Sequence, residues 1–249
     1  MRSPIRAGLV AVILLTACQG GGLPLGPAFE CPTTAPVVPV TGAAASQQPS
    51  TVAADPSASA GPTPLNADEV LAGVTGVRVE TSLGSFTIEL RADAAPLAAA
   101  NFVALARCGF YDGVTFHRVL AGFVIQAGDP NTRENQGDFE GLGTGNPGYG
   151  FETEVPPEGV NYDPYAVAMA NAGIPNSNGS QFFVCLTDLN TRLPRAYSIF
   201  GNVTEGREVV DAIGQVEVNH PALGVPVDPV VINSMEVLTA ESTPSSDGP

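Results

Sequence analysis

The chain has 249 residues, of which 25 are acidic and 10 are basic, so its formal net charge at pH 7 is -15. This charge disfavours binding to nucleic-acid phosphates or to an anionic membrane surface, and we expect no nucleic-acid partner. The hydrophobic content of 44%, with 28 Gly and 23 Pro, indicates a turn-rich globular domain joined to a low-complexity segment.

The first 17 residues are typical of an export signal. Arg2 and Arg6 precede an apolar run over residues 7–15 that is too short to cross a bilayer. The next residues, Leu15-Thr16-Ala17-Cys18, resemble the bacterial lipobox, in which the cysteine is acylated. We therefore predict a lipoprotein signal peptide over residues 1–17, lipidation of Cys18 and anchoring to the membrane of the bacterial cell envelope, outside the cytoplasm. The alternative is an ordinary secretory signal with an incidental cysteine.

The residues that follow Cys18 form a low-complexity segment. Residues 18–70 are rich in Pro, Ala, Ser and Thr, and they have too few large apolar side chains to fold. We predict that they are a disordered tether, and that the polar residues 241–249 are a disordered tail. The folded domain is then expected over residues 71–240.

The remaining cysteines, Cys31, Cys108 and Cys185, and the histidines His117 and His220 are spaced too widely for a zinc motif. We therefore expect no metal site. Cys185 lies in an apolar run and is interpreted as a small buried side chain. An oxidising compartment permits a disulfide, but the sequence does not assign one.

From about residue 74, short apolar runs alternate with turns. Residues 77–80 and 86–90 alternate between apolar and polar side chains, which predicts a hairpin. Pro96 begins a short amphipathic helix over residues 97–106, and a second helix over 207–213 is closed by Gly214. Further strands are expected over residues 114–120, 123–127, 166–170, 182–186, 199–203 and 230–238. Many short strands with two helices predict a mainly β barrel or sandwich, and the pattern does not choose between these.

Two segments, residues 116–129 and 169–183, place polar side chains among large apolar ones. Strand alternation puts Phe116 and Arg118 on one face and His117 on the other. Arg118 is thereby directed at a surface that also holds phenylalanine. Residues 143–148 match the glycine pattern of dinucleotide-binding loops, but the proline and glycines there prevent the required helix, so we predict a surface loop.

Both segments resemble the signature stretches of the cyclophilin family of prolyl isomerases. Supporting motifs follow in family order at residues 101–102, 111–113, 151–154 and 200–201, and the resemblance extends from about residue 77 to 238. It implies an eight-stranded antiparallel β-barrel capped by two α-helices. It also implies a peptidyl-prolyl cis-trans isomerase that needs no cofactor, and we expect a monomer that acts on proline-containing polypeptides.

The expected reaction breaks no bond. Rotation about an Xaa-Pro bond faces a barrier of about 20 kcal/mol, and a catalyst must stabilise the twisted amide, whose pyramidal nitrogen accepts a hydrogen bond. A guanidinium in a partly dry groove suits this task. The resemblance assigns that role to Arg118, with Phe123 and Gln126 as further catalytic residues. The substrate-binding residues that it implies are Val124, Ala170, Asn171, Gln181, Phe183, Leu193 and Tyr197.

Some positions depart from the family pattern. Arg192 stands beside Leu193 where many members have Trp or Phe, and Val124 replaces the usual Met. These departures predict weaker cyclosporin binding and a changed preference for the residue before proline. We expect an enzyme that assists the folding of exported proteins. The alternative is a proline-peptide-binding or scaffold module that has the groove but little turnover.

Overall fold

The computed structural model describes residues 31–33, 66–133, 141–219 and 221–240. The predicted signal peptide, Cys18, most of the tether, His220 and the C-terminal tail lie outside these residues, so what was predicted for them stays a prediction. None of the helices in the described ranges is both long enough and apolar enough to cross a membrane.

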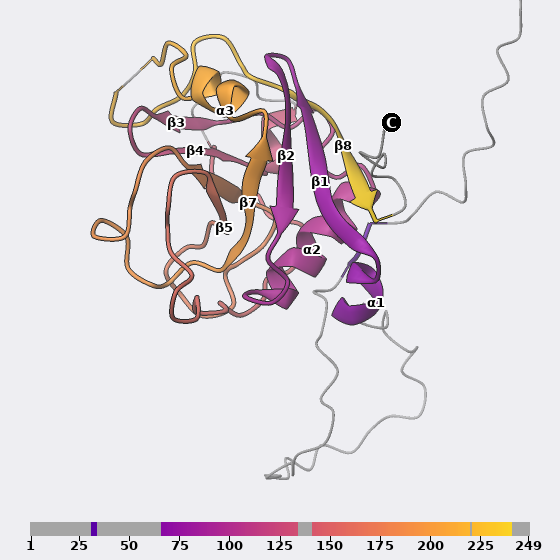
Figure 1. Cartoon of the computed structure of the whole chain (residues 1–249). Helices are drawn as coiled ribbons and strands as arrows, with labels where there is room; N and C mark the ends of the chain where they lie inside the picture. Colours follow the sequence, from indigo (N-terminus) through magenta and orange to yellow (C-terminus); the bar gives the residue numbers. More distant parts are fainter. Residues whose placement is uncertain (1–30, 34–65, 134–140, 220, 241–249) are drawn as a thin grey trace, which may run out of the picture.

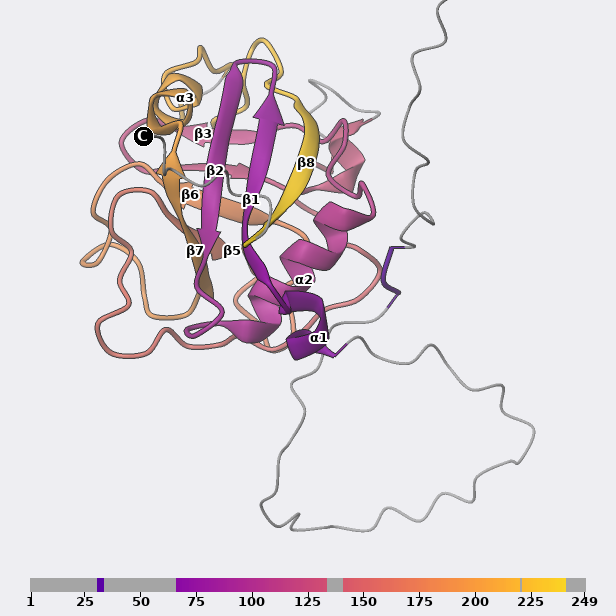
Figure 2. The same ribbon diagram turned by 45° about the vertical axis from the view of Figure 1, so that its right-hand side comes forward.

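Eight antiparallel strands form one curved sheet (Figure 1). The order is β3-β4-β6-β5-β7-β2-β1-β8, and the long hairpin of β1 and β2 lies between β7 and β8 (Figure 2). This confirms the predicted mainly β, eight-stranded arrangement, and it favours the barrel over the sandwich. The strands are β1 (Val74–Thr81), β2 (Gly84–Leu90), β3 (Arg118–Leu120), β4 (Val124–Ala127), β5 (Ala166–Met169), β6 (Phe182–Cys185), β7 (Ile199–Glu205) and β8 (Ile232–Thr239).

The two outer strands, β3 and β8, are joined through the segments that precede them. Thr115 and Val231 form an isolated antiparallel bridge. The N–H of Phe116 donates to the carbonyl of Val230 at 2.9 Å. These bonds give backbone partners to what would otherwise be open edges, so the curved sheet is drawn toward a barrel.

Next to the bridge between Thr115 and Val231, the side chains do not alternate between the two faces of the sheet as predicted. Phe116 lies in the interior core with Val119, whereas Arg118 is partly exposed. The prediction that Phe116 and Arg118 share one face is therefore wrong. The regular strand begins only at Arg118, and the chain before it is irregular, so the two-residue period does not extend back to Phe116.

Helices α2 (Pro96–Arg107) and α3 (Arg207–Ile213) pack on the sheet, and α1 (Ala67–Leu71) packs against α2. A short 3-10 helix covers Pro130–Arg133. The two predicted helices are present, and α3 ends at Gly214 as expected. Helix α1 is additional, and the expected tether boundary at residues 70 and 71 falls inside it. The guanidinium of Arg107 donates to the carbonyl of Val70 at 2.9 Å, which holds α1 against α2.

Helix α2 is buried on all sides, which corrects the prediction of an amphipathic helix. Every residue from Ala98 to Ala106 is buried. Alanine side chains are small enough to let the strands on one side and α1 on the other approach closely (Figure 2). The ring of Phe102 projects into the barrel, where its centroid lies 4.9 Å from that of Phe200 and 5.2 Å from that of Phe182.

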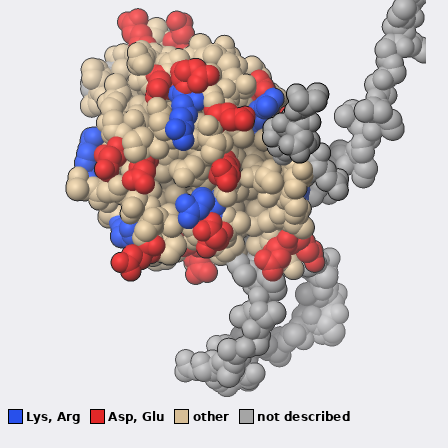
Figure 3. Space-filling model, viewed as in Figure 1, with Lys and Arg blue, Asp and Glu red and all other residues tan. Residues whose placement is uncertain are grey.

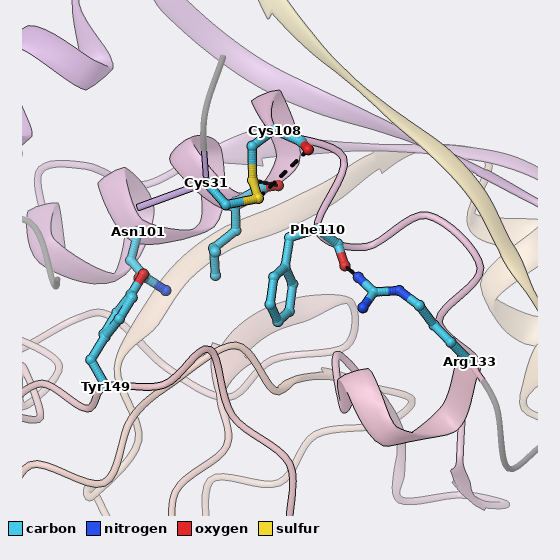
Figure 4. The surroundings of a disulfide bond; sticks show 7 residues. Cys31, Asn101, Cys108, Phe110, Arg133 and Tyr149 are labelled. Atoms are coloured by element: carbon cyan, nitrogen blue, oxygen red, sulfur yellow. Dashed lines mark hydrogen bonds between the residues drawn. A yellow bond between two sulfur atoms is a disulfide. The ribbon is translucent and has the colours of Figure 1, made fainter. Parts of the chain in front are cut away.

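A disulfide joins Cys31 to Cys108, the residue that follows α2 (Figure 4). It attaches a segment that lies 77 residues earlier in the chain to the end of the central helix. Cys185 is buried, as predicted, and its thiol is free. Burial raises the pKa of this thiol to about 12, so it is un-ionised at neutral pH.

Candidate active site

Strand β6 is buried on both faces and separates the core from the candidate site. Phe182 and Val184 belong to the interior cluster, whereas Phe183 and Cys185 belong to a second apolar cluster on the outer face. The outer cluster receives Val124 from the neighbouring strand β4. The predicted site residues lie on and around this outer face.

Arg118 and Gln126 are direct partners in the ladder between β3 and β4. The Nη1 of Arg118 donates to the Oε1 of Gln126 over a long 3.4 Å. Within the described ranges, no carboxylate forms an ion pair with Arg118. The partly exposed guanidinium therefore keeps most of its donors and its full charge available to a ligand.

A chain of side-chain amides fixes the orientation of Gln126. The Nε2 of Gln181 donates to the carbonyl of Gly145 at 2.8 Å, and the Oε1 of Gln181 accepts from the Nε2 of Gln126 at 3.0 Å. A carbonyl only accepts, so the direction of every bond in the chain follows from its end at Gly145. The oxygen of Gln126 is thereby turned toward Arg118.

The residues predicted for the proline pocket lie together in the outer cluster. Val124 and Phe183 are buried in the outer cluster, and the partly exposed residues packed against them are Phe123, Ala170, Leu193 and Tyr197. The ring of Tyr197 meets that of Phe183 edge to face, with 5.5 Å between centroids. An apolar surface able to hold a prolyl ring therefore lies on the strand pair that also carries Gln126.

Arg192 lies at the rim of this pocket. Its Cζ is 4.6 Å from the centroid of the Phe123 ring, and its Nη1 donates to the carbonyl of Gly122 at 3.1 Å. Arg192 was noted in the sequence only as a departure from the family pattern. Its planar cation lies over the Phe123 ring.

A polar cavity of about 360 Å³ adjoins the pocket. Four predicted site residues line it, namely Gln126, Ala170, Asn171 and Gln181, together with residues of the loop 143–150 and of the segment 176–180. The predicted surface loop over residues 143–148 is confirmed, and it forms one wall of this cavity. Gln126 and Gln181 therefore separate an apolar pocket from a polar cavity.

The family model described as cyclophilin type peptidyl-prolyl cis-trans isomerase/CLD matches residues 76–237. The chain belongs to the cyclophilin family. Peptidyl-prolyl cis-trans isomerase A of Mycobacterium tuberculosis is 40% identical over 177 residues, which cover 64% of this chain and 90% of that protein. Peptidyl-prolyl cis-trans isomerase B of Streptomyces anulatus is 41% identical over 178 residues, 65% of this chain and 95% of that protein.

Solved structures give the same result. A crystal structure of a Cryptosporidium parvum cyclophilin type peptidyl-prolyl cis-trans isomerase aligns with a TM-score of 0.58 and 32% identity, covering 67% of this chain and 98% of that one. The same isomerase in the presence of the dipeptide Ala-Pro aligns with 33% identity over 66% of this chain and 99% of that one. This cyclophilin is therefore a peptidyl-prolyl cis-trans isomerase, as the sequence predicted.

The side-chain amide of Asn171 forms hydrogen bonds within the protein. Its Nδ2 donates to the carbonyl of Ala196 at 2.8 Å, and its Oδ1 accepts from the N–H of Gly173 at 3.0 Å. Its main-chain N–H and C=O have no bond to the residues that the structure describes. Any bond that Asn171 makes to a substrate backbone is therefore expected from its main chain.

Asn101 was noted in the sequence as part of a motif, but it was given no role. This fully buried side chain of α2 donates to the carbonyl of Gly179 at 2.8 Å and accepts from the hydroxyl of Tyr149 at 2.7 Å (Figure 4). Gly179 and Tyr149 lie on two segments that line the cavity. An amide in an otherwise apolar helix was the available signal, because such a group needs buried partners.

His117 is buried next to Arg118. Burial lowers the pKa of its imidazole to about 4; the nearby Arg118 charge acts in the same direction, and Asp129 opposes both. The imidazole is therefore neutral at pH 7.

Proposed function

We propose that Arg118 catalyses rotation about Xaa-Pro bonds of exported proteins, and that this cyclophilin does so while anchored to the bacterial cell envelope. The observation that carries the catalytic part is the Arg118 guanidinium, which has one long hydrogen bond to Gln126 and no ion pair in the described part of the chain. A paired guanidinium would be less free to bind the twisted amide.

The mechanism follows from the two surfaces that meet at Gln126. Phe123, Phe183 and Leu193 hold the prolyl ring, which fixes one side of the rotating amide bond. As the amide twists, its nitrogen becomes pyramidal and accepts a hydrogen bond from Arg118. The apolar pocket excludes water from one side of this bond, which strengthens it in the transition state relative to the planar ground state. No atom is transferred and no bond is broken.

The cellular site is supported by two independent features. The export signal and lipobox at residues 1–18 predict a lipid anchor on Cys18. The disulfide between Cys31 and Cys108 supports export, because such bonds persist in oxidising compartments and are rare in a reducing cytosol.

The catalytic proposal is tested with residues 19–249 and an Ala-Pro peptide, by two-dimensional exchange NMR. We expect Arg118→Ala to lower kcat/KM by roughly 100-fold or more, the loss typical of a missing transition-state donor. Arg78→Ala, which removes an exposed arginine from β1, is the matched control and should be unaffected. Equal rates for wild type and Arg118→Ala would rule out the mechanism.

The same samples test the alternative of a binding module. Peptide titration with no acceleration by the wild-type protein would favour a proline-peptide-binding or scaffold role. Measurable turnover together with binding would favour the enzyme.

The anchoring proposal is tested by expressing the full chain in a bacterial host and separating membrane from soluble fractions. We expect the wild type in the membrane fraction with an acylated Cys18, and Cys18→Ser without the acyl group. Equal acylation of both chains would contradict the proposal.

A further inference from the structure

Arg192 is held in place at two points although it is exposed. Its guanidinium stacks on the ring of Phe123 at 4.6 Å, and its Nη1 bonds to the carbonyl of Gly122 at 3.1 Å. Its backbone N–H donates to the carbonyl of Leu189 at 2.9 Å, which closes a turn over the buried Leu189. The side chain therefore loses little further freedom when it binds a ligand.

The charge of Arg192 has no partner of opposite sign in the described ranges. The nearest acidic residue along the chain, Asp188, directs its Oδ1 at the N–H and Nδ2 of Asn190. One donor of Arg192 is used by Gly122, so the other N–H groups remain available at the rim of the pocket.

Arg192 is a cation on a strongly acidic protein. The chain contains no lysine, and all ten of its basic residues are arginines against 25 acidic residues. Figure 3 shows acidic side chains spread over one face of the molecule, with basic side chains lying singly among them. Arg118 and Arg192 are both unpaired and both border the apolar pocket, so this pocket is flanked by positive charge on a protein that is otherwise negative.

We propose that Arg192 is a specificity-determining residue, which favours substrates that carry an acidic side chain next to the proline held against Phe123. This inference rests on the proposed role of Phe123 and Leu193 in binding the prolyl ring. The distant acidic residues of the protein repel such a substrate, whereas Arg192 attracts it at contact range. An exposed ion pair of this kind changes affinity by about two- to fivefold.

The test compares six peptides that each contain one proline, with Glu, Gln or Lys placed either directly before or directly after that proline. Exchange NMR gives kcat/KM for each peptide at low salt and at high salt. At one of the two positions we expect the wild type to have a kcat/KM for the Glu peptide that is more than about twice that for the Lys peptide, with the difference in KM. At high salt this Glu-to-Lys ratio should move closer to one, because the charges are screened.

Two variants assign the preference to Arg192. In Arg192→Gln the Glu-to-Lys ratio should fall to about one, and in Arg192→Glu it should fall below one. Arg78→Gln, on the far strand β1, should keep the wild-type ratio and its basal activity. The ratio is the readout, so a general loss of rate in either variant does not decide the outcome.

Failure of this inference is distinguishable from failure of the proposed function. Turnover of the Gln peptide with equal rates for the Glu and Lys peptides at both positions would overturn the role of Arg192 alone. A preference for Glu that persists in Arg192→Gln would assign the effect to another cation and overturn it as well. No turnover of the Gln peptide by the wild type would instead overturn the catalytic proposal, and with it this one.

Discussion

Glu154 accepts the backbone N–H of Leu97 at 2.9 Å and so caps the first turn of α2 from 57 residues away in the chain. Its second oxygen accepts the N–H of Ala98 at 2.9 Å. The residue at the ordinary capping position, Ala95, has no side chain able to do this. The central helix is therefore held at its N-terminus by the segment that follows the cavity loop.

Removing this carboxylate should destabilise the domain. Glu154→Ala leaves two N–H groups without their partner, so we expect the free energy of unfolding to fall by about 1 to 2 kcal/mol. Urea denaturation followed by circular dichroism measures the change. Glu158→Ala, at an exposed position on the same segment, is the matched control. A change in Glu154→Ala no larger than in this control would show that the cap contributes nothing.

His117 should make the fold sensitive to mild acid. Its pKa is about 4 in the folded protein because the ring is buried, against 6.5 for the free side chain. The unfolded chain therefore binds a proton between these values more readily than the folded one. The stabilisation is present above pH 6.5 and is lost as the pH falls toward 4, by roughly 3 kcal/mol in all.

The measurement is the unfolding free energy at several pH values from 7 to 4 for wild type and for His117→Phe. The carboxylates titrate in both proteins, so the difference between the two curves isolates the imidazole. We expect the wild type to lose more stability than the variant as the pH is lowered. Parallel curves would contradict this account.

Regular local patterns predicted most of the fold. The hairpin of β1 and β2 was predicted from alternating side chains, and the end of α3 from Gly214. The expected face of Phe116 was wrong because that residue bonds to Val230, more than 100 positions later in the chain. No period within a short segment carries information about such a partner.

In the candidate site too, residues marked by local sequence motifs were predicted, whereas contacts that depend on the folded chain were not. The pocket residues Phe123 and Phe183 were found because family motifs mark them, and the fold brings them together. The stacking of Arg192 on Phe123 was missed because it depends on how the loop after β6 folds back over β4. The partner of Cys31 was missed for a similar reason, since proximity to Cys108 arises only in the folded chain.

The disulfide between Cys31 and Cys108 is expected to stabilise the domain by restricting the unfolded chain. A bridge across 77 residues typically contributes about 2 to 4 kcal/mol. Cys31→Ser, Cys108→Ser and the double variant should lose the same amount, because either substitution removes the whole bond. Urea denaturation measures each loss, and thiol counting by mass spectrometry confirms the bond in the wild type. Wild-type stability that is unchanged by a reductant would exclude this contribution.

Gln181 is expected to act through Gln126, as a positioning residue for Arg118. In Gln181→Met the acceptor for the Nε2 of Gln126 is lost, so this amide is free to rotate and to present a donor to the guanidinium. Two facing donors repel, and Arg118 should leave its catalytic position. We expect kcat for an Ala-Pro peptide to fall by about tenfold, which corresponds to roughly 1.4 kcal/mol, while the unfolding free energy changes little.

The matched control for this variant is Gln215→Met, at an exposed glutamine beyond α3, and it should leave kcat unchanged. A structural role for Gln181 would lower stability and would act on KM as much as on kcat, because the cavity wall at Gly145 would move. A fall in kcat with unchanged KM and unfolding free energy would therefore show that Gln181 positions Arg118 and does not act through the packing of the cavity wall. Wild-type kcat in Gln181→Met would show that Arg118 holds its orientation without the amide chain.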